Sequence, residues 1–406
     1  MSDPQTPEWL SKANSEADFL DLHAVLPLDF ESLVLHARVA TGLDDFGDDY
    51  WQEPLQILCK DLDSVAELTL FGRIAARSDL LIWLENRLNI IELIKQHPEI
   101  TEQEITAPMF IVGLPRSGTS ILFEVLAQDP DVGVPLTWES MFPYPPPEES
   151  SYQTDPRIQR AHRMYTQWAR LVPEFASIHE MGGQIPAECG MLMCSSFISD
   201  QIASMQMADN DGAWHATADV RPAYEWHKLV LQVLQWKNPR KRWLLKAPAH
   251  QNYLDILLET YPDARIVQTH RDPIKCMAST TNLMACIYKM RSDRPFDAVA
   301  FDNILMGEPT AKRLEQVMDQ RENGIVPDSS ICDSHYYDLL EDPISNVKKI
   351  YAHFGMQLGE NAASKMTQYL ADKPQGKFGA HNYTSNVSER PFFNRYQEHY
   401  GVPSEV

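Results

Sequence analysis

The feature that most constrains the fold is the segment GLPRSGTS at residues 113–120. It follows a stretch rich in β-branched and aromatic residues at 105–113 and precedes an amphipathic run over residues 118–128. In a strand, loop and helix of this kind, glycines at both ends let the loop curl, so that backbone N–H groups and the helix N-terminus face an anion. A purely structural turn is the alternative. The segment therefore predicts an anion-binding loop at the start of an α/β unit.

One position separates this loop from that of the nucleoside triphosphatases. It matches the pattern GxxxxGK[ST] except that Thr119 stands where the lysine is expected. A triphosphatase needs that lysine at the β/γ-phosphates and a carboxylate that helps to hold magnesium. Here the cation is Arg116, inside the loop. A P-loop small-molecule kinase or nucleotide hydrolase is therefore an alternative that this loop does not favour.

Further strands are expected downstream of the loop, at residues 242–248, 264–273 and 329–337. The first two flank the helix-like stretch QNYLDILLETY, and a strand–helix–strand order implies a parallel, right-handed crossover. We therefore expect a P-loop-type, three-layer α/β/α fold with a central parallel sheet.

Other regions show helical spacing of apolar residues. We expect a helical N-terminal region over residues 1–100, followed by a catalytic domain over residues 101–406, in which residues 157–236 are largely helical. Prolines crowd residues 135–147, for which we expect an extended path across the surface.

Charge and cysteine content exclude several partners. The chain has 35 Lys and Arg against 57 Asp and Glu, a net charge of −22 that repels phosphodiester backbones, so we expect no nucleic-acid partner. Six scattered cysteines, without CxxC pairs, predict no metal site. The acidic, polar start of the chain is unlike a secretory signal, and no run reaches about 18 apolar residues, so we expect a cytoplasmic protein without integral membrane association.

The loop sequence PRSGT resembles the PAPS-dependent sulfotransferases, in particular a bacterial branch and, more distantly, the tyrosylprotein sulfotransferases. The resemblance implies direct, metal-independent transfer of a sulfonyl group from 3′-phosphoadenosine 5′-phosphosulfate (PAPS) to a small alcohol or phenol, hydrophobic in character. The product nucleotide is adenosine 3′,5′-bisphosphate (PAP). The 5′-phosphosulfate would bind Pro115, Arg116, Ser117, Gly118, Thr119 and Ser120. Neither the acceptor's identity nor the oligomeric state follows from the sequence.

The second family signature is an arginine at a strand end with a serine eight positions later, here Arg271 and Ser279. The resemblance implies that they bind the 3′-phosphate. An arginine offers a planar fork of donors to a terminal phosphate, and a serine two helical turns along adds a hydroxyl donor. A surface ion pair between Arg271 and Asp272 is the alternative.

The segment LKAPAH at residues 245–250 resembles the LKSPxH element of this branch. Lys246 is the expected catalytic cation, because a fixed ammonium stabilises the charge that grows on the bridging oxygen of the departing 5′-phosphate. A structural lysine is the alternative. His250 is a second candidate for the general base, against a capping or packing role.

The first candidate for the general base is Glu139, since the family places a glutamate from the segment after the loop helix near the acceptor. A carboxylate can accept the acceptor's proton, whereas a helix cap or surface acid is the alternative. Tyr336 lies in a YYD segment that resembles the family's YED segment, which implies stacking on adenine. Lys377, in a segment loosely similar to the family's terminal nucleotide cover, is a candidate phosphate contact.

A non-enzymatic alternative is a nucleotide-binding scaffold whose catalytic groups have decayed. Four residues that the sulfotransferase reaction requires are all present, which argues against it: Arg116, Lys246, Arg271 and Ser279.

Overall fold

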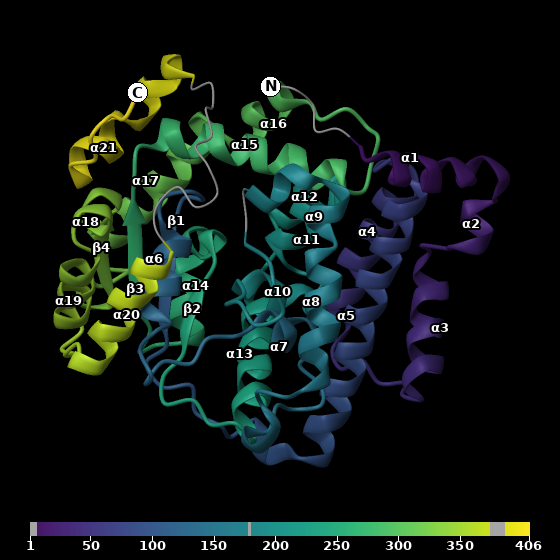
Figure 1. The fold of residues 1–406 in the computed structure, drawn as a ribbon, viewed down its shortest axis with the longest axis horizontal. Coiled ribbons are helices and arrows are strands. Elements are labelled where there is room, and N and C mark those ends of the chain that lie inside the picture. Colours follow the sequence, from purple (N-terminus) through teal and green to yellow (C-terminus); the bar gives the residue numbers. More distant parts are fainter. Residues whose placement is uncertain (1–5, 178–179, 374–385) are drawn as a thin grey trace. The chain divides into compact units, whose positions relative to one another are not determined.

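The computed structural model describes residues 6–177, 180–373 and 386–406 (Figure 1). It separates into two compact units, each built from three stretches of chain. The helical unit comprises Met1–Glu104, Leu136–Pro239 and Met284–Phe296, and the sheet unit comprises Ile105–Pro135, Arg240–Leu283 and Asp297–Val406. The expected domains at residues 1–100 and 101–406 stay a prediction.

The sheet unit is built on four parallel strands in the order β2-β1-β3-β4 (Figure 1). Their bounds are Met109–Gly113 for β1, Leu244–Lys246 for β2, Arg265–His270 for β3 and Ile331–His335 for β4. All five residues of β1 are buried, as expected for a central strand of a parallel sheet that is covered on both faces. The parallel α/β fold of the P-loop type is confirmed.

Helices follow the strands of this unit. They are α6 (Thr119–Leu126), α14 (Leu254–Thr260), α15 (Pro273–Lys289), α16 (Ala298–Leu305), α17 (Glu308–Glu322), α18 (Tyr336–Glu341), α19 (Pro343–His353), α20 (Glu360–Asp372) and α21 (Asn394–Tyr400). On one side, α6 packs on β1 and β2, and α19 packs on β4. Their shared core includes Ile111, Leu122, Val267 and Ile350, all fully buried. A second core lies among α15, α17 and α21 and includes Leu314, Met318 and Phe393.

The helical unit contains twelve α-helices among its described residues. They are α1 (Glu8–Ser15), α2 (Leu22–Val25), α3 (Phe30–Thr41), α4 (Gln52–Ser64), α5 (Leu70–Gln96), α7 (Thr137–Met141), α8 (Pro156–Thr166), α9 (Trp168–Leu171), α10 (Cys189–Met193), α11 (Asp200–Gln206), α12 (Asp209–His215) and α13 (Arg221–Trp236). None of the helices in the described part of the chain, in either unit, has the length and apolarity needed to cross a bilayer.

The long helix α5 shows why this region is helical. It begins at a Thr69 cap, whose hydroxyl accepts a hydrogen bond from the N–H of Gly72 at 3.0 Å. Leu80, Leu84 and Leu88 recur every four residues and are fully buried on one face. The predicted helical spacing of the region before the sheet is confirmed.

The proline-rich stretch at residues 135–147 is not wholly extended, and our expectation for it was wrong. The prolines leave a gap in which α7 forms, and Trp138 within it is fully buried. Glu139 caps the helix by accepting a hydrogen bond from the N–H of Leu136 at 2.9 Å. Burial of a large aromatic side chain and the cap from Glu139 together stabilise a helix that is too short to form alone.

Candidate functional site

The loop between β1 and α6 has a backbone that depends on its glycines. Gly113 has a φ of 137° and Gly118 a φ of 99°, both in the region that side chains rarely adopt. A Cβ at Gly113 would lie 2.3 Å from the Thr269 hydroxyl oxygen. The loop therefore passes against β3 with no room for a side chain. The loop leads directly into the first turn of α6, whose backbone N–H groups have no acceptor within the helix.

Ser117 ties this loop to the sheet. Its Oγ donates to the carbonyl oxygen of Leu114 at 2.6 Å and shares a second hydrogen bond of 2.6 Å with Oγ1 of Thr269. The side chain is buried, so these bonds hold the loop against the end of β3. A direct bond from the Ser117 side chain to a ligand stays a prediction.

Arg116 lies at the tip of the loop and has a positive φ of 70°. Such a conformation costs a non-glycine residue about 1–2 kcal/mol and is concentrated at functional sites. Its Nε donates to Oγ of Ser279 at 3.0 Å, and Ser279 lies on α15. Two residues predicted to bind opposite ends of one nucleotide are thus in direct contact.

Arg271 joins this pair from the end of β3. Its Nη1 donates to the carbonyl oxygen of Arg116 at 3.0 Å, and its guanidinium lies 4.1 Å from the ring centre of Tyr336. Gly118 faces the same ring, since a Cβ there would be 2.8 Å from Cδ2 of Tyr336. The residues predicted for the loop, the 3′-phosphate and the adenine therefore form one cluster in the sheet unit.

The predicted alternative for Arg271, an ion pair with Asp272, is wrong. Asp272 is fully buried and pairs with Arg390, whose Nη1 and Nη2 lie 2.5 and 3.0 Å from its carboxylate oxygens. The partner of Arg271 is Glu405, which accepts hydrogen bonds from Nε at 2.7 Å and Nη2 at 2.8 Å. Burial lowers the pKa of Arg271, but Glu405, Cys276 and Tyr336 together raise that pKa above its usual value, so the guanidinium stays charged.

Lys246 ends β2 beside the start of α6. Its side chain is buried, and Nζ donates to Oγ of Ser120 at 3.3 Å and lies 5.8 Å from the ring centre of Phe123. Ser120 belongs to the first turn of α6. The ammonium group is therefore held next to the helix N-terminus at which the loop would place an anion.

Two further loop residues, Pro115 and Thr119, lie in the segment that runs from β1 into the first turn of α6, and their contacts with a nucleotide stay a prediction. Pro115 is half-buried, and Thr119 is the first residue of α6 with a buried side chain. Lys377 lies outside the described residues.

The two base candidates are both buried. Glu139 accepts hydrogen bonds at Oε2 from the N–H of Leu136 and from the hydroxyl of Tyr152, each at 2.9 Å. These are contacts of a helix-capping carboxylate, within the helical unit. His250 lies in the turn after β2 and meets Phe110 edge to face at 5.2 Å, within the sheet unit. Which of them acts as the base stays a prediction.

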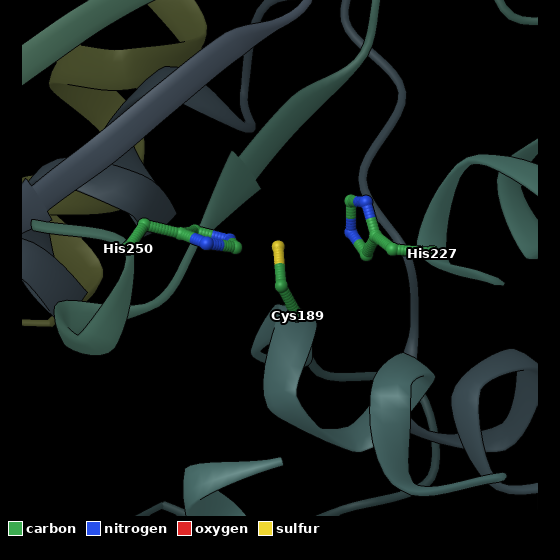
Figure 2. A group of neighbouring side chains, drawn as sticks. All are labelled: Cys189, His227 and His250. Atoms are coloured by element: carbon green, nitrogen blue, oxygen red, sulfur yellow. The ribbon is translucent and has the colours of Figure 1, made fainter. Parts of the chain in front are cut away.

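A cysteine–histidine pair lies in the helical unit. Cys189 on α10 and His227 on α13 are both buried, and their ligand atoms lie within 4.8 Å of each other (Figure 2). A structural zinc site takes four protein ligands, and a catalytic one takes three. The expectation that the chain holds no metal stays a prediction.

Sequence reasoning missed Glu405 and Arg390. Both lie over 100 positions from the residues that they contact, and neither belongs to a recognisable motif. No local pattern could have indicated that these side chains meet Arg271 and Asp272.

Comparisons with known proteins agree with this geometry. Omega-hydroxy-beta-dihydromenaquinone-9 sulfotransferase Stf3 of Mycobacterium bovis is 24% identical over 308 residues, which are 72% of this chain and 73% of that protein. The crystal structure of sulfotransferase STF9 from Mycobacterium avium has a TM-score of 0.81 and 25% identity, over 93% of this chain and 98% of that chain. Sulfotransferase STF1 from Mycobacterium tuberculosis has a TM-score of 0.74 and 28% identity, over 91% and 98%.

The model of the sulfotransferase family matches residues 108–360, which include the loop, Lys246, Arg271 and Ser279. This match spans more than half of the chain. The chain therefore belongs to the sulfotransferase family.

Proposed function

We propose that this sulfotransferase uses PAPS as its sulfonyl donor and a hydroxyl group as its acceptor. One observation carries the proposal. The chain of contacts from Ser279 through Arg116 and Arg271 to Tyr336 links an anion-binding loop to a second cation and an aromatic ring. PAPS has a matching set of groups, namely a 5′-phosphosulfate, a 3′-phosphate and an adenine. A nucleotide without a 3′-phosphate has no group that matches the second cation.

The proposed roles follow from charge. Arg116 and the N–H groups at the start of α6 bind the 5′-phosphosulfate, because an anion is stabilised at a helix N-terminus. Arg271 and Ser279 bind the 3′-phosphate. Lys246 stabilises the departing 5′-phosphate, and its position beside Ser120 supports this role.

The proposed reaction is a direct in-line displacement. An electron pair of the acceptor oxygen attacks sulfur while the bond between sulfur and the bridging oxygen breaks. That bond's electrons move to the bridging oxygen, where the ammonium of Lys246 offsets the charge. The acceptor's proton passes to Glu139 or His250. The products are a sulfate ester and PAP, and the cations in this scheme are supplied by side chains.

For the acceptor, we propose a small, hydrophobic molecule with a free hydroxyl group. The name of the Mycobacterium bovis relative gives an omega-hydroxylated dihydromenaquinone as that protein's acceptor, which supports the choice of class. We further propose a cytoplasmic location, without nucleic-acid partners.

A transfer assay tests the proposal. The chain is incubated with PAPS that carries a radioactive sulfonyl group, in EDTA, with a phenol, a long-chain alcohol and an omega-hydroxylated dihydromenaquinone as acceptors. We expect a labelled ester and an equal amount of PAP with at least one of them, both strongly reduced in Lys246→Met. A parallel incubation replaces PAPS and EDTA with magnesium-ATP. Transfer of phosphate to these acceptors there, with no reaction of PAPS, would instead assign the chain to the kinases.

A further inference from the structure

The guanidinium of Arg271 is occupied within the chain itself. Glu405 accepts two parallel hydrogen bonds from this guanidinium, from Nε at 2.7 Å and from Nη2 at 2.8 Å. Both side chains are largely shielded from water, with 17% of Arg271 and 14% of Glu405 exposed. Two parallel N–H···O bonds of this kind are the strongest form of arginine–carboxylate contact.

The segment that carries Glu405 is held by its backbone as well. The N–H of Glu405 donates to Asp272 at 2.7 Å. Arg390 bridges Asp272 and the carbonyl oxygen of Val406, the latter at 2.9 Å. The contact between Glu405 and Arg271 is thus one part of an ordered arrangement around the end of β3.

The preceding helix α21 is anchored independently of the Arg271 guanidinium. The hydroxyl of Tyr396 forms a 2.8 Å hydrogen bond with Nδ1 of His270, and Tyr400 stacks on the same imidazole at 4.2 Å. The other ring nitrogen of His270, Nε2, forms a 2.9 Å hydrogen bond with the Asp333 carboxylate. Because this anchor does not use the guanidinium of Arg271, residues 401–406 can leave that guanidinium while α21 stays in place.

A carboxylate and a phosphate offer an arginine the same feature, a pair of oxygens that accept two parallel hydrogen bonds. Glu405 engages the Nε and Nη2 donors of Arg271, a parallel pair of the kind that a phosphate also binds. Both anions cannot bind the same edge of one guanidinium.

We propose that Glu405 occupies the binding position of the nucleotide's 3′-phosphate and has to leave Arg271 before that phosphate can bind. This inference rests on the proposed function, since it takes Arg271 as the 3′-phosphate ligand. Glu405 then sets how strongly the chain prefers nucleotides that carry a 3′-phosphate. Binding of such a nucleotide is coupled to release of residues 401–406.

A different role for Glu405 would have the opposite effect. If Glu405 stayed in place and merely positioned the guanidinium for the phosphate, its loss would weaken nucleotide binding. Competition predicts that its loss strengthens binding, and only for nucleotides with a 3′-phosphate. The sign of the effect therefore separates the two roles.

The test compares Glu405→Gln with the wild type by calorimetric titration. The ligands are PAP and adenosine 5′-monophosphate, which lacks the 3′-phosphate. The control is Glu398→Gln, which removes the same charge from an exposed position of α21. We expect Glu405→Gln to bind PAP about tenfold more tightly, or about 1.4 kcal/mol, with the Kd of adenosine 5′-monophosphate changed less than about twofold. Glu398→Gln should match the wild type with both ligands.

Equal or weaker binding of PAP by Glu405→Gln, with clear binding by the wild type, would overturn the competition and leave the proposed function standing. Absence of PAP binding in all three proteins would instead remove the proposed function, and the inference with it.

Hydrogen exchange provides a second readout that does not depend on affinity. The amide of Glu405 is protected by Asp272 in the free protein. Saturating PAP should increase exchange in residues 401–406 of the wild type and leave that of α21 unchanged. Unchanged or slower exchange in residues 401–406 would contradict the release.

Discussion

Gly118 offers a sharp test of how the loop is built, through its substitution by alanine. Its φ of 99° lies beyond the left-handed region that non-glycine residues tolerate best. A Cβ would also lie 2.8 Å from Cδ2 of Tyr336, closer than the separation of about 3.5 Å at which carbon contacts become favourable. The new methyl group is therefore opposed by both the backbone and the tyrosine ring.

The two terms can be estimated separately. The backbone term is about 1–2 kcal/mol, and forcing extra volume into a packed contact adds about 1–3 kcal/mol. We therefore expect Gly118→Ala to lower the free energy of unfolding by about 3 kcal/mol. Because Tyr336 supports the guanidinium of Arg271 at 4.1 Å, displacement of the ring should also weaken PAP binding about fivefold or more.

Gly324 supplies the matched control. It has a φ of 71°, and a Cβ there would meet nothing within 4 Å. Gly324→Ala should therefore cost only the backbone term, about 1–2 kcal/mol, and leave PAP binding unchanged. Urea denaturation and calorimetric titration measure both effects. If the two variants lost equal stability and both bound PAP normally, the steric account of the loop would be refuted.

Three further predictions address catalysis, pH and the core. Lys246→Met should lower kcat about 10²–10³-fold with a nearly unchanged Kd for PAP, because the ammonium acts on charge that develops during transfer; a kcat near wild type in steady-state assays would disprove its role. Burial raises the pKa of Asp211 to about 7, so the folded state binds an extra proton and the free energy of unfolding falls as the pH rises. In the wild type this fall amounts to about 2–3 kcal/mol between pH 5 and 7, and Asp211→Asn should abolish it. Urea denaturation at several pH values measures the effect, and an equal pH dependence of the two proteins would contradict the prediction. Leu84→Ala should cost about 2–5 kcal/mol by thermal or urea unfolding, since Leu84 is fully buried, and a loss below about 1 kcal/mol would contradict this packing.

The parts of the fold that sequence reasoning predicted are those encoded over short stretches. The strands β1 and β3 each contain an adjacent isoleucine and valine, and the glycines at 113 and 118 mark loop positions whose positive φ favours glycine. The contact between Arg116 and Ser279 was not predicted, although parallel strands place their carboxyl ends at one edge of a sheet and so bring the following segments together.

The parts that it missed depend on contacts between distant residues. The helix α7 forms in a proline-rich stretch because Trp138 is buried and Glu139 caps the first turn. Glu405 reaches Arg271 across 134 positions of sequence, and no periodicity or motif indicates such a pair. Tertiary contacts of this kind override local propensity at a proline-rich segment and at a chain segment without regular structure.

Calorimetric titration with PAP, in EDTA and then in magnesium, tests the central claim most directly. The proteins are the wild type, Arg271→Ala and the control Arg395→Ala, which removes a charge from an exposed position of α21. The account predicts equal PAP binding with and without magnesium, a loss of about tenfold to a hundredfold in Arg271→Ala, and normal binding in Arg395→Ala. Absence of PAP binding in the wild type, or binding of magnesium-ATP alone, would contradict it.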